Sequence, residues 1–315
     1  MPRIGTFIRD VYRRPGGDAL PAHLQEHYGI RVATTTKVDA GVYKVEQHEG
    51  PTWVARLFVV GRSVARAEGD AEVLRFLQRR GFPAERCAHP EPVSSLDGRA
   101  VLVTEHVEGR AWPQSPAARR ALGDMLGRLH ALPTEPGPTE RPAGSLHHLP
   151  AYEGYPSQDL AAAAALLADL EGRVPAEHQR TYESLQGLLP KADDGRDLPG
   201  SFVHPDPVGS NVIATPAGGP VLVDWTGAGR GPRLCSLAAL LASLSPPHVA
   251  DVLAGYRAHI TLTAEEVDRL EGALWARPLW LASWQCWLAC VSSKVTGAFV
   301  PDAKRIAAIA ARARA

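Results

Sequence analysis

The chain has 315 residues, of which 45% are hydrophobic and 22% charged, and its formal net charge is +0 at pH 7. This composition favours a folded globular protein over a disordered one, and the length predicts two lobes. A balanced charge creates no field that would attract nucleic acid or an anionic membrane, so we expect neither as a partner. The four cysteines are scattered and the first residues contain no apolar signal segment, which predicts a cytoplasmic protein with reduced thiols.

The first third of the chain predicts a sheet and one helix. Residues 34–60 contain two runs of β-branched and aromatic residues separated by a turn sequence, which predicts a hairpin. Residues 67–80 have apolar residues at helical spacing and are followed by Gly81, as is typical of a helix C-terminus. Residues 99–107 predict a further strand.

The remainder is predicted to be mainly helical. Residues 117–132 carry an apolar stripe that stops at a proline, and Ala-rich helices are expected at 158–171 and 175–190. Between them, residues 133–157 are rich in Pro and Gly and predict a long loop or lid near the substrate. The pair His147 and His148 in this loop is interpreted as exposed, with no assigned role.

An apolar stretch near the C-terminus, residues 278–291, is shorter than the roughly 20 residues that a membrane-spanning helix needs. We therefore interpret it as a buried core helix. Its tryptophans Trp280, Trp284 and Trp287 share one helix face. Core packing is the preferred interpretation of these rings, and an aromatic wall of an acceptor site is the alternative.

The densest group of polar residues follows at 201–225, SFVHPDPVGSNVIATPAGGPVLVDW. Its strand and turn pattern places Asp206, Asn211 and Asp224 at strand ends. Phosphoryl transfer needs a carboxylate that orients and deprotonates a hydroxyl, together with oxygen ligands for magnesium. This segment supplies both kinds of group.

The spacing His204-x-Asp206, Asn211 and then VLVDW closely resembles the signature of the aminoglycoside phosphotransferase and choline kinase superfamily, relatives of protein kinases. The resemblance implies Asp206 as the catalytic base, His204 as a brace for its loop, and Asn211 and Asp224 as magnesium ligands. Ser236 stands where many relatives have a structural aspartate.

The resemblance also implies an α+β, bilobal protein-kinase-like fold that binds ATP and Mg²⁺. Residues 1–107 would form a small nucleotide-binding lobe with an antiparallel sheet and a helix. Residues 108–315 would form a mainly helical lobe that carries the catalytic residues and binds the acceptor. ATP would lie between the two lobes.

Further nucleotide contacts follow from the resemblance in the first lobe. The run VAR, ending at Arg56, is similar to the kinase V-A-I-K strand, with arginine in place of the usual lysine. The resemblance implies Glu72 as the acidic partner of Arg56, and Glu68 is the alternative one turn earlier. VLVTEHVEG resembles the hinge between kinase lobes, so backbone groups from Glu105 to Val107 would hold adenine.

The loop expected over the phosphates, residues 34–42, contains only Gly41 and lacks a G-x-G-x-x-G pattern. Phosphate contacts would then come from the hydroxyls of Thr35 and Thr36, from Lys37, and from backbone N–H groups.

Together these features predict an ATP- and magnesium-dependent phosphotransferase that modifies a hydroxyl of a small molecule such as an antibiotic, a sugar or an amino alcohol. Residues 113–315 contain 20 Asp and Glu against 18 Lys and Arg, which does not favour a polycationic aminoglycoside as acceptor. A kinase of Ser or Thr in a peptide is one alternative. A pseudokinase that binds nucleotide or a partner protein is another, because Arg56 and the irregular phosphate loop depart from the kinase pattern.

Overall fold

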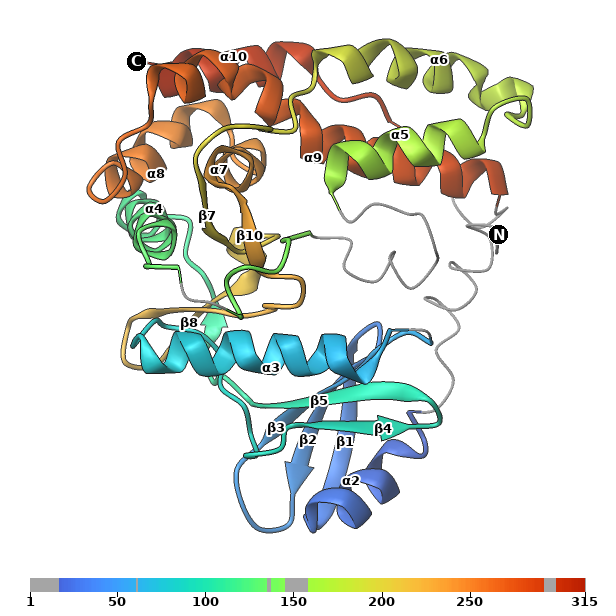
Figure 1. Ribbon diagram of the computed structural model, residues 1–315, viewed down its shortest axis with the longest axis vertical. Coiled ribbons are helices and arrows are strands. Elements are labelled where there is room, and N and C mark those ends of the chain that lie inside the picture. The colour runs from blue at the N-terminus through green and yellow to red at the C-terminus, as the bar shows by residue number, and fades with distance from the viewer. Residues whose placement is uncertain (1–16, 61, 135–136, 145–157, 292–298, 315) are drawn as a thin grey trace.

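The computed structural model describes residues 17–60, 62–134, 137–144, 158–291 and 299–314. It divides into a sheet-containing N-terminal part and a helical C-terminal part (Figure 1). The predicted loop at 133–157, with His147 and His148, lies largely outside the described residues.

The N-terminal sheet is antiparallel, with the strand order β1-β2-β3-β5-β4. Its strands are β1 (Val32–Asp39), β2 (Val42–Gln47), β3 (Trp53–Leu57), β4 (Val93–Leu96) and β5 (Arg99–Glu105). This confirms the predicted α+β class and the predicted strand at 99–107. Residues 34–60 contribute to three strands rather than the two predicted, because the first run turns back on itself at Gly41.

One helix packs on each face of this sheet. Helix α2 (Leu20–Tyr28) buries Leu20 and Leu24 against the face that carries Tyr43 and Val45. On the opposite face lies α3 (Val64–Arg79), which begins with Ser63 accepting a hydrogen bond from the Arg66 N–H, a standard N-cap. Helix α3 agrees with the predicted helix, whereas α2 was not predicted because it offers only two buried apolar residues.

The C-terminal part is built from helices and two small sheets. Its α-helices are α4 (Pro116–His130), α5 (Asp159–Asp169), α6 (Gln179–Leu188), α7 (Arg233–Ala242), α8 (Val249–Tyr256), α9 (Ala264–Val291) and α10 (Ala303–Arg314). Short 3₁₀ helices are η2 (Ala176–His178), η3 (Leu189–Lys191), η4 (Gly209–Asn211) and η5 (Pro246–His248). One sheet has the order β6 (Arg110–Ala111), β8 (Val212–Ala214), β9 (Pro220–Leu222), and the other pairs β7 (Gly200–Val203) with β10 (Gly229–Pro232).

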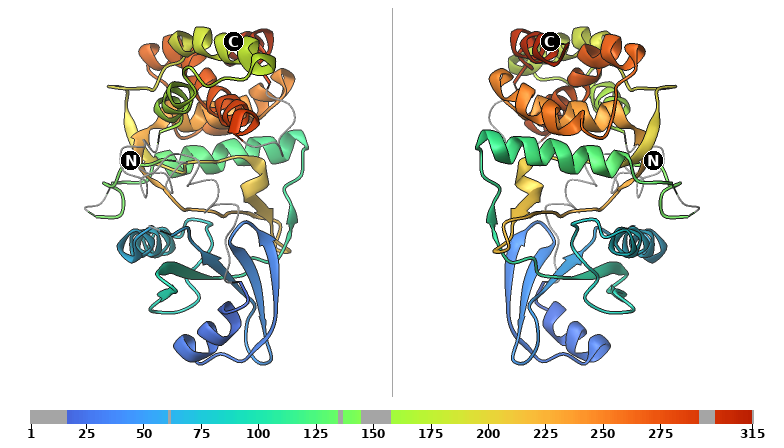
Figure 2. Two further views of the ribbon diagram at one scale, coloured as in Figure 1. Left: turned by 90° about the vertical axis from the view of Figure 1, so that its right-hand side faces the viewer. Right: turned by 90° about the vertical axis from the view of Figure 1, so that its left-hand side faces the viewer.

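The chain changes partners just after β5. Strand β5 is the last strand of the N-terminal sheet, whereas β6, five residues later in the sequence at Arg110, pairs with β8 of the C-terminal part. The side views in Figure 2 show α4 on the side of the helical part that faces the sheet. This change of partner supports the lobe boundary that we propose between residues 107 and 108.

Helix α9 forms the centre of the C-terminal core. Its residues Cys286 and Trp287 are fully buried, which agrees with the interpretation of residues 278–291 as a core helix. The rings of Trp280, Trp284 and Trp287 stack in sequence along α9. In the described part of the chain, none of the helices combines the length and the apolar character that crossing a membrane requires.

Candidate active site

The turn after β7 contains the first predicted catalytic pair. His204 is fully buried; its Nδ1 accepts the N–H of Asp206 at 3.0 Å and its Nε2 donates to the Val223 carbonyl at 3.1 Å. This pattern requires the neutral Nε2–H tautomer. Burial lowers the pKa of His204, which favours the same neutral form. The geometry supports the bracing role expected for His204.

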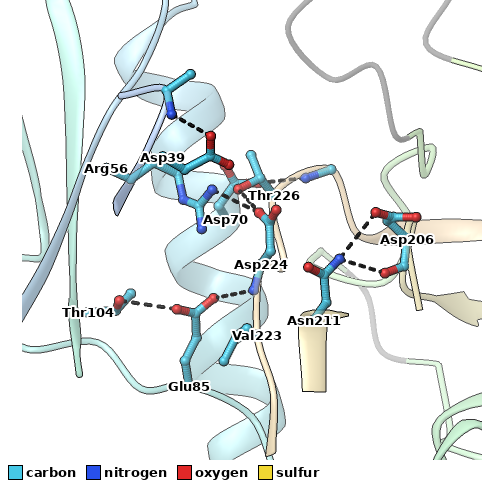
Figure 3. A network of polar contacts seen from close by, with 12 residues as sticks. Asp39, Arg56, Asp70, Glu85, Thr104, Asp206, Asn211, Val223, Asp224 and Thr226 are labelled. Carbon is cyan, nitrogen blue, oxygen red and sulfur yellow. Dashed lines mark hydrogen bonds and ion pairs between the residues drawn. The ribbon is translucent and has the colours of Figure 1, made fainter. Parts of the chain in front are cut away.

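Asn211 is fixed against the catalytic turn by two hydrogen bonds from its amide nitrogen. Nδ2 donates to the Asp206 carbonyl oxygen at 2.9 Å and to Asp206 Oδ2 at 3.2 Å. These contacts orient the side chain, so that its amide oxygen lies on the side of Asp224 (Figure 3). The Asp206 side chain remains 41% exposed, which leaves its carboxylate accessible to a hydroxyl group.

Asp224 follows β9 with a left-handed backbone, φ 67, a conformation that costs a non-glycine residue roughly 1–2 kcal/mol. Its backbone N–H donates to Glu85 Oε1 at 2.9 Å. Its Oδ1 lies 2.9 Å from Arg56 Nη1 and accepts from Thr226 Oγ1 at 3.2 Å. Backbone and side chain are thus both held by neighbours (Figure 3). A non-glycine residue in a strained backbone conformation often marks a functional site.

Glu85 is a buried acid that the sequence reasoning missed. It lies after α3, where the backbone of residues 83–85 pairs with Leu222, and it also accepts the Thr104 hydroxyl at 3.1 Å. Burial raises the pKa of Glu85. Burial acts to lower the pKa of Arg56, but Asp224 and then Glu85 outweigh it, so that this pKa is raised. The arginine therefore stays charged beside the Asp224 carboxylate. The sequence signal that could have identified Glu85 as buried is its position directly after the apolar residues Phe82, Pro83 and Ala84.

The predicted role of Glu72 as partner of Arg56 is wrong. Glu72 is exposed and pairs with Arg75 at 2.6 Å, and the alternative Glu68 is also exposed. The buried acid of α3 is Asp70, on the helix face that also buries Ala67, Ala71 and Leu74. With 3.6 residues per turn, position 72 lies away from that face.

Asp70 connects the two parts of the chain rather than contacting Arg56. Its carboxylate forms ion pairs with Arg62 and, at 2.6 Å, with Arg141, and it accepts the Gly227 N–H at 3.4 Å. Arg141 also donates to the Ala228 carbonyl at 2.6 Å. The segment after Asp224 is therefore held against α3.

Strand register decides which residues of the expected phosphate loop face the cleft. Directly opposite residues of an antiparallel pair share a face. Thr35 pairs with Val45 and Lys37 with Tyr43, and these partners pack against α2. The side chains of Thr35 and Lys37 therefore lie on the face opposite Arg56, which corrects their predicted phosphate contacts.

Thr36 lies on the same face as Arg56, because it pairs with Lys44, which in turn pairs with Val54. Gly41 has φ 71 in the turn between β1 and β2, and its carbonyl accepts the Leu57 N–H at 2.7 Å. For Thr36 and Gly41, contact with phosphate stays a prediction.

At the expected hinge, two backbone N–H groups already have partners. Glu105 donates to the Arg86 carbonyl at 2.8 Å and His106 to the Thr52 carbonyl at 3.0 Å. A cavity of about 380 Å³ borders Glu105, His106 and Val107. Adenine binding by backbone groups from Glu105 to Val107 stays a prediction.

A family model described as the APH phosphotransferase enzyme family matches residues 36–273, a range that contains Asp206, Asn211 and Asp224. The chain belongs to this family. It is a kinase-type phosphotransferase whose acceptor is an alcohol group. A search of curated proteins finds no match.

Solved structures with the same fold include three phosphotransferases. Amicoumacin kinase hAmiN is 16% identical, with a TM-score of 0.64 and coverage of 97% of this chain and 94% of that one. Choline kinase LicA from Streptococcus pneumoniae is 13% identical, with a TM-score of 0.59 and coverage of 94% and 96%. An aminoglycoside-3'-phosphotransferase of type VIII is 24% identical, with a TM-score of 0.56 and coverage of 85% and 98%. These likenesses confirm the bilobal kinase-like fold.

The donor set of this phosphotransferase fits a magnesium ion. The Asn211 amide oxygen and the Asp224 carboxylate are the hard oxygen ligands that Mg²⁺ prefers, and Mg²⁺ commonly takes its other ligands from phosphates and water. No group of three or more His, Cys, Asp or Glu in the described ranges is arranged to hold a metal. Magnesium binding by Asn211 and Asp224 stays a prediction.

Arg277, in α9, was also missed by the sequence reasoning. Its Nη2 donates to the Pro205 carbonyl at 2.6 Å and lies 3.1 Å from Asp206 Oδ1, while its Nε lies 3.2 Å from Asp159 Oδ2. The catalytic turn is fixed from its other end by Ser236, whose hydroxyl donates to the His204 carbonyl at 3.1 Å. A serine thus supports this turn where many relatives would have an aspartate.

Proposed function

We propose that this phosphotransferase moves the γ-phosphoryl group of MgATP to a hydroxyl group of a small molecule, in the cytoplasm. The observation that carries the proposal is the convergence of Asp206, Asn211 and Asp224 next to Arg56 of the N-terminal sheet. All four cysteines are free thiols, which supports a reducing compartment.

In the proposed reaction, Asp206 accepts a hydrogen bond from the acceptor hydroxyl and takes its proton as the oxygen attacks the γ-phosphorus. A new O–P bond forms while the bond between the γ-phosphorus and the bridging oxygen breaks, and ADP leaves. Arg56 provides positive charge beside the phosphates. Bound magnesium, held by Asn211 and Asp224, would neutralise phosphate charge. Catalysis then rests on positioning and on charge stabilisation.

The test compares thermal unfolding of the wild type, Asp224→Asn and Asp206→Asn, each with and without excess MgATP. A ligand at 100 times its dissociation constant stabilises a protein by about 2.7 kcal/mol. We expect this stabilisation in the wild type and in Asp206→Asn, and its loss in Asp224→Asn. The exposed Asp268→Asn is the matched control and should behave like the wild type.

Turnover separates catalysis from binding alone. With a reactive acceptor, or with water as acceptor in an ATP hydrolysis assay, Asp206→Asn should lower the rate by ~10²–10⁴ while keeping the affinity for MgATP. Full activity of Asp206→Asn would refute the mechanism. Stabilisation by MgATP without any transfer in the wild type would instead indicate a pseudokinase, and no stabilisation would contradict the proposed function.

A further inference from the structure

The cavity that contains the catalytic base also contains two arginines. Its volume is about 450 Å³, and its lining includes Asp206 and Asp224 together with Arg277, Trp280 and Arg305 from α9 and α10. Asp224 is paired with Arg56 and, in the proposed function, holds the metal. The lining of this cavity therefore decides which acceptor can bring a hydroxyl group to Asp206.

The charge of Arg277 is already compensated. Its guanidinium lies 3.2 Å from Asp159 and 3.1 Å from Asp206, and its side chain is only 11% exposed. It also lies over the Trp280 ring, 5.5 Å from the centroid. Arg277 is thus a positioning residue for the turn at Pro205 and Asp206, and its positive charge is already balanced by Asp159 and Asp206.

Arg305 is different, because no carboxylate neutralises it among the residues that the structure describes. Its Nη2 donates to the carbonyls of Ala242 and Leu244, at 2.6 and 2.8 Å. These bonds fix the guanidinium at the C-terminal end of α7, where the helix dipole favours a cation. Within the same described residues, Nε and Nη1 have no hydrogen-bond partner, so that the N–H donors of these two nitrogens remain for another group.

Apolar side chains surround this cation in the cavity. Leu281 and Phe299 are 40% and 41% exposed, and Trp280 is half-buried beside them. Exposed apolar groups of this size next to a charged group are typical of a site for an amphipathic ligand. Trp280 therefore contributes to a cavity wall, whereas Trp287 of the same stack belongs to the core.

We propose that the acceptor carries an anionic group, such as a carboxylate, phosphate or sulfonate, that pairs with Arg305. Its apolar or aromatic body packs on Trp280 and Phe299, and its hydroxyl group reaches Asp206. This inference rests on the proposed function, which it narrows to anionic amphipathic alcohols. A polycationic acceptor would place positive charges near Arg305, while the two acids of the lining, Asp206 and Asp224, already pair with Arg277 and Arg56.

The test uses two fluorescent probes that differ by one charge, 8-anilinonaphthalene-1-sulfonate and its sulfonate-free analogue N-phenyl-1-naphthylamine. Both are titrated into the full chain. Loss of a charge-assisted contact should weaken binding about 10-fold or more. Arg305→Gln should therefore lower the affinity for the sulfonate probe by that factor and leave the affinity for the neutral probe within about twofold of the wild type. Arg305→Lys, which keeps the positive charge, should retain most of the affinity for the sulfonate probe.

Two further variants locate the probes and control for nonspecific charge. Trp280→Leu should lower the affinity for both probes, because the apolar rings of both would pack against the Trp280 ring. Arg312→Gln removes an exposed arginine from the same helix α10 and should leave both affinities unchanged. Unchanged binding of the neutral probe by Arg305→Gln shows that the cavity remains folded in that variant.

Several results would overturn the inference: no saturable binding of the sulfonate probe, equal affinity for both probes, or a sulfonate affinity that Arg305→Gln leaves unchanged. MgATP-dependent stabilisation is measured on the same samples. If MgATP stabilises the wild type while the probes show no charge preference, the inference on the acceptor fails and the proposed function stands. If the probes show the preference and MgATP has no effect, the proposed function fails and the anionic site stands.

Discussion

Replacement of Glu85 by alanine tests whether this buried acid positions the metal ligand. Glu85 accepts the backbone N–H of Asp224 at 2.9 Å and the Thr104 hydroxyl at 3.1 Å. Alanine leaves both donors without their partner, and an unsatisfied buried polar group costs about 1–3 kcal/mol. Because Asp224 has a left-handed backbone, φ 67, loss of its N–H bond should let the backbone relax and move the carboxylate.

We expect Glu85→Ala to lower the free energy of unfolding by about 2–4 kcal/mol, from two donors at about 1–3 kcal/mol each with partial compensation by water. Affinity for MgATP should fall about 10-fold or more, which corresponds to about 1.4 kcal/mol of lost positioning. Urea unfolding and calorimetric titration of MgATP measure the two effects. Glu85→Gln can still accept from Asp224 and donate to the Thr104 oxygen, so its MgATP affinity should stay within about threefold of the wild type.

The exposed Glu91→Ala, in the same connection between α3 and β4, is the control and should change neither quantity. Glu85→Ala with wild-type affinity for MgATP would refute the positioning role, even if stability falls. A Gln variant as impaired as the Ala variant would show instead that the negative charge of Glu85, which raises the pKa of Arg56, is what matters.

Two further predictions concern stability alone. Burial lowers the pKa of His130 to about 3, so that between about pH 6.5 and 3 the unfolded chain binds a proton that the folded chain does not. The free energy of unfolding should therefore fall as the pH drops through this range, by up to about 1.4 kcal/mol per pH unit. Urea unfolding of His130→Gln should show a correspondingly flatter pH dependence, and an unchanged slope would exclude His130 as its source. Gly123→Ala would place a Cβ 1.9 Å from the Val252 carbonyl oxygen and should cost about 1–3 kcal/mol or more, whereas Gly187→Ala, with open space around it, should gain up to about 1 kcal/mol.

The sequence determined the chemistry that lies close together along the chain. Asp206, Asn211 and Asp224 fall within one strand-turn-strand segment, so their spacing was enough to predict a shared site. Local periodicity also gave the helix after the hairpin and most strands of the N-terminal sheet. In each case the physical signal is contained in a short stretch, where side-chain period and turn residues determine the backbone conformation.

Tertiary structure decided the partners of these residues. Glu85 meets Asp224 across 139 positions of the chain, and Arg277 meets Pro205 across 72. The prediction of Glu72 failed because the rotation of α3 about its axis depends on which side chains it buries, and it buries Asp70 instead. Likewise, Thr35 and Lys37 point away from Arg56 because strand pairing sets the face of every residue in β1. Helix rotation, strand register and the placement of Arg305 beside the cavity all follow from packing between distant segments, which spacing along the sequence does not encode.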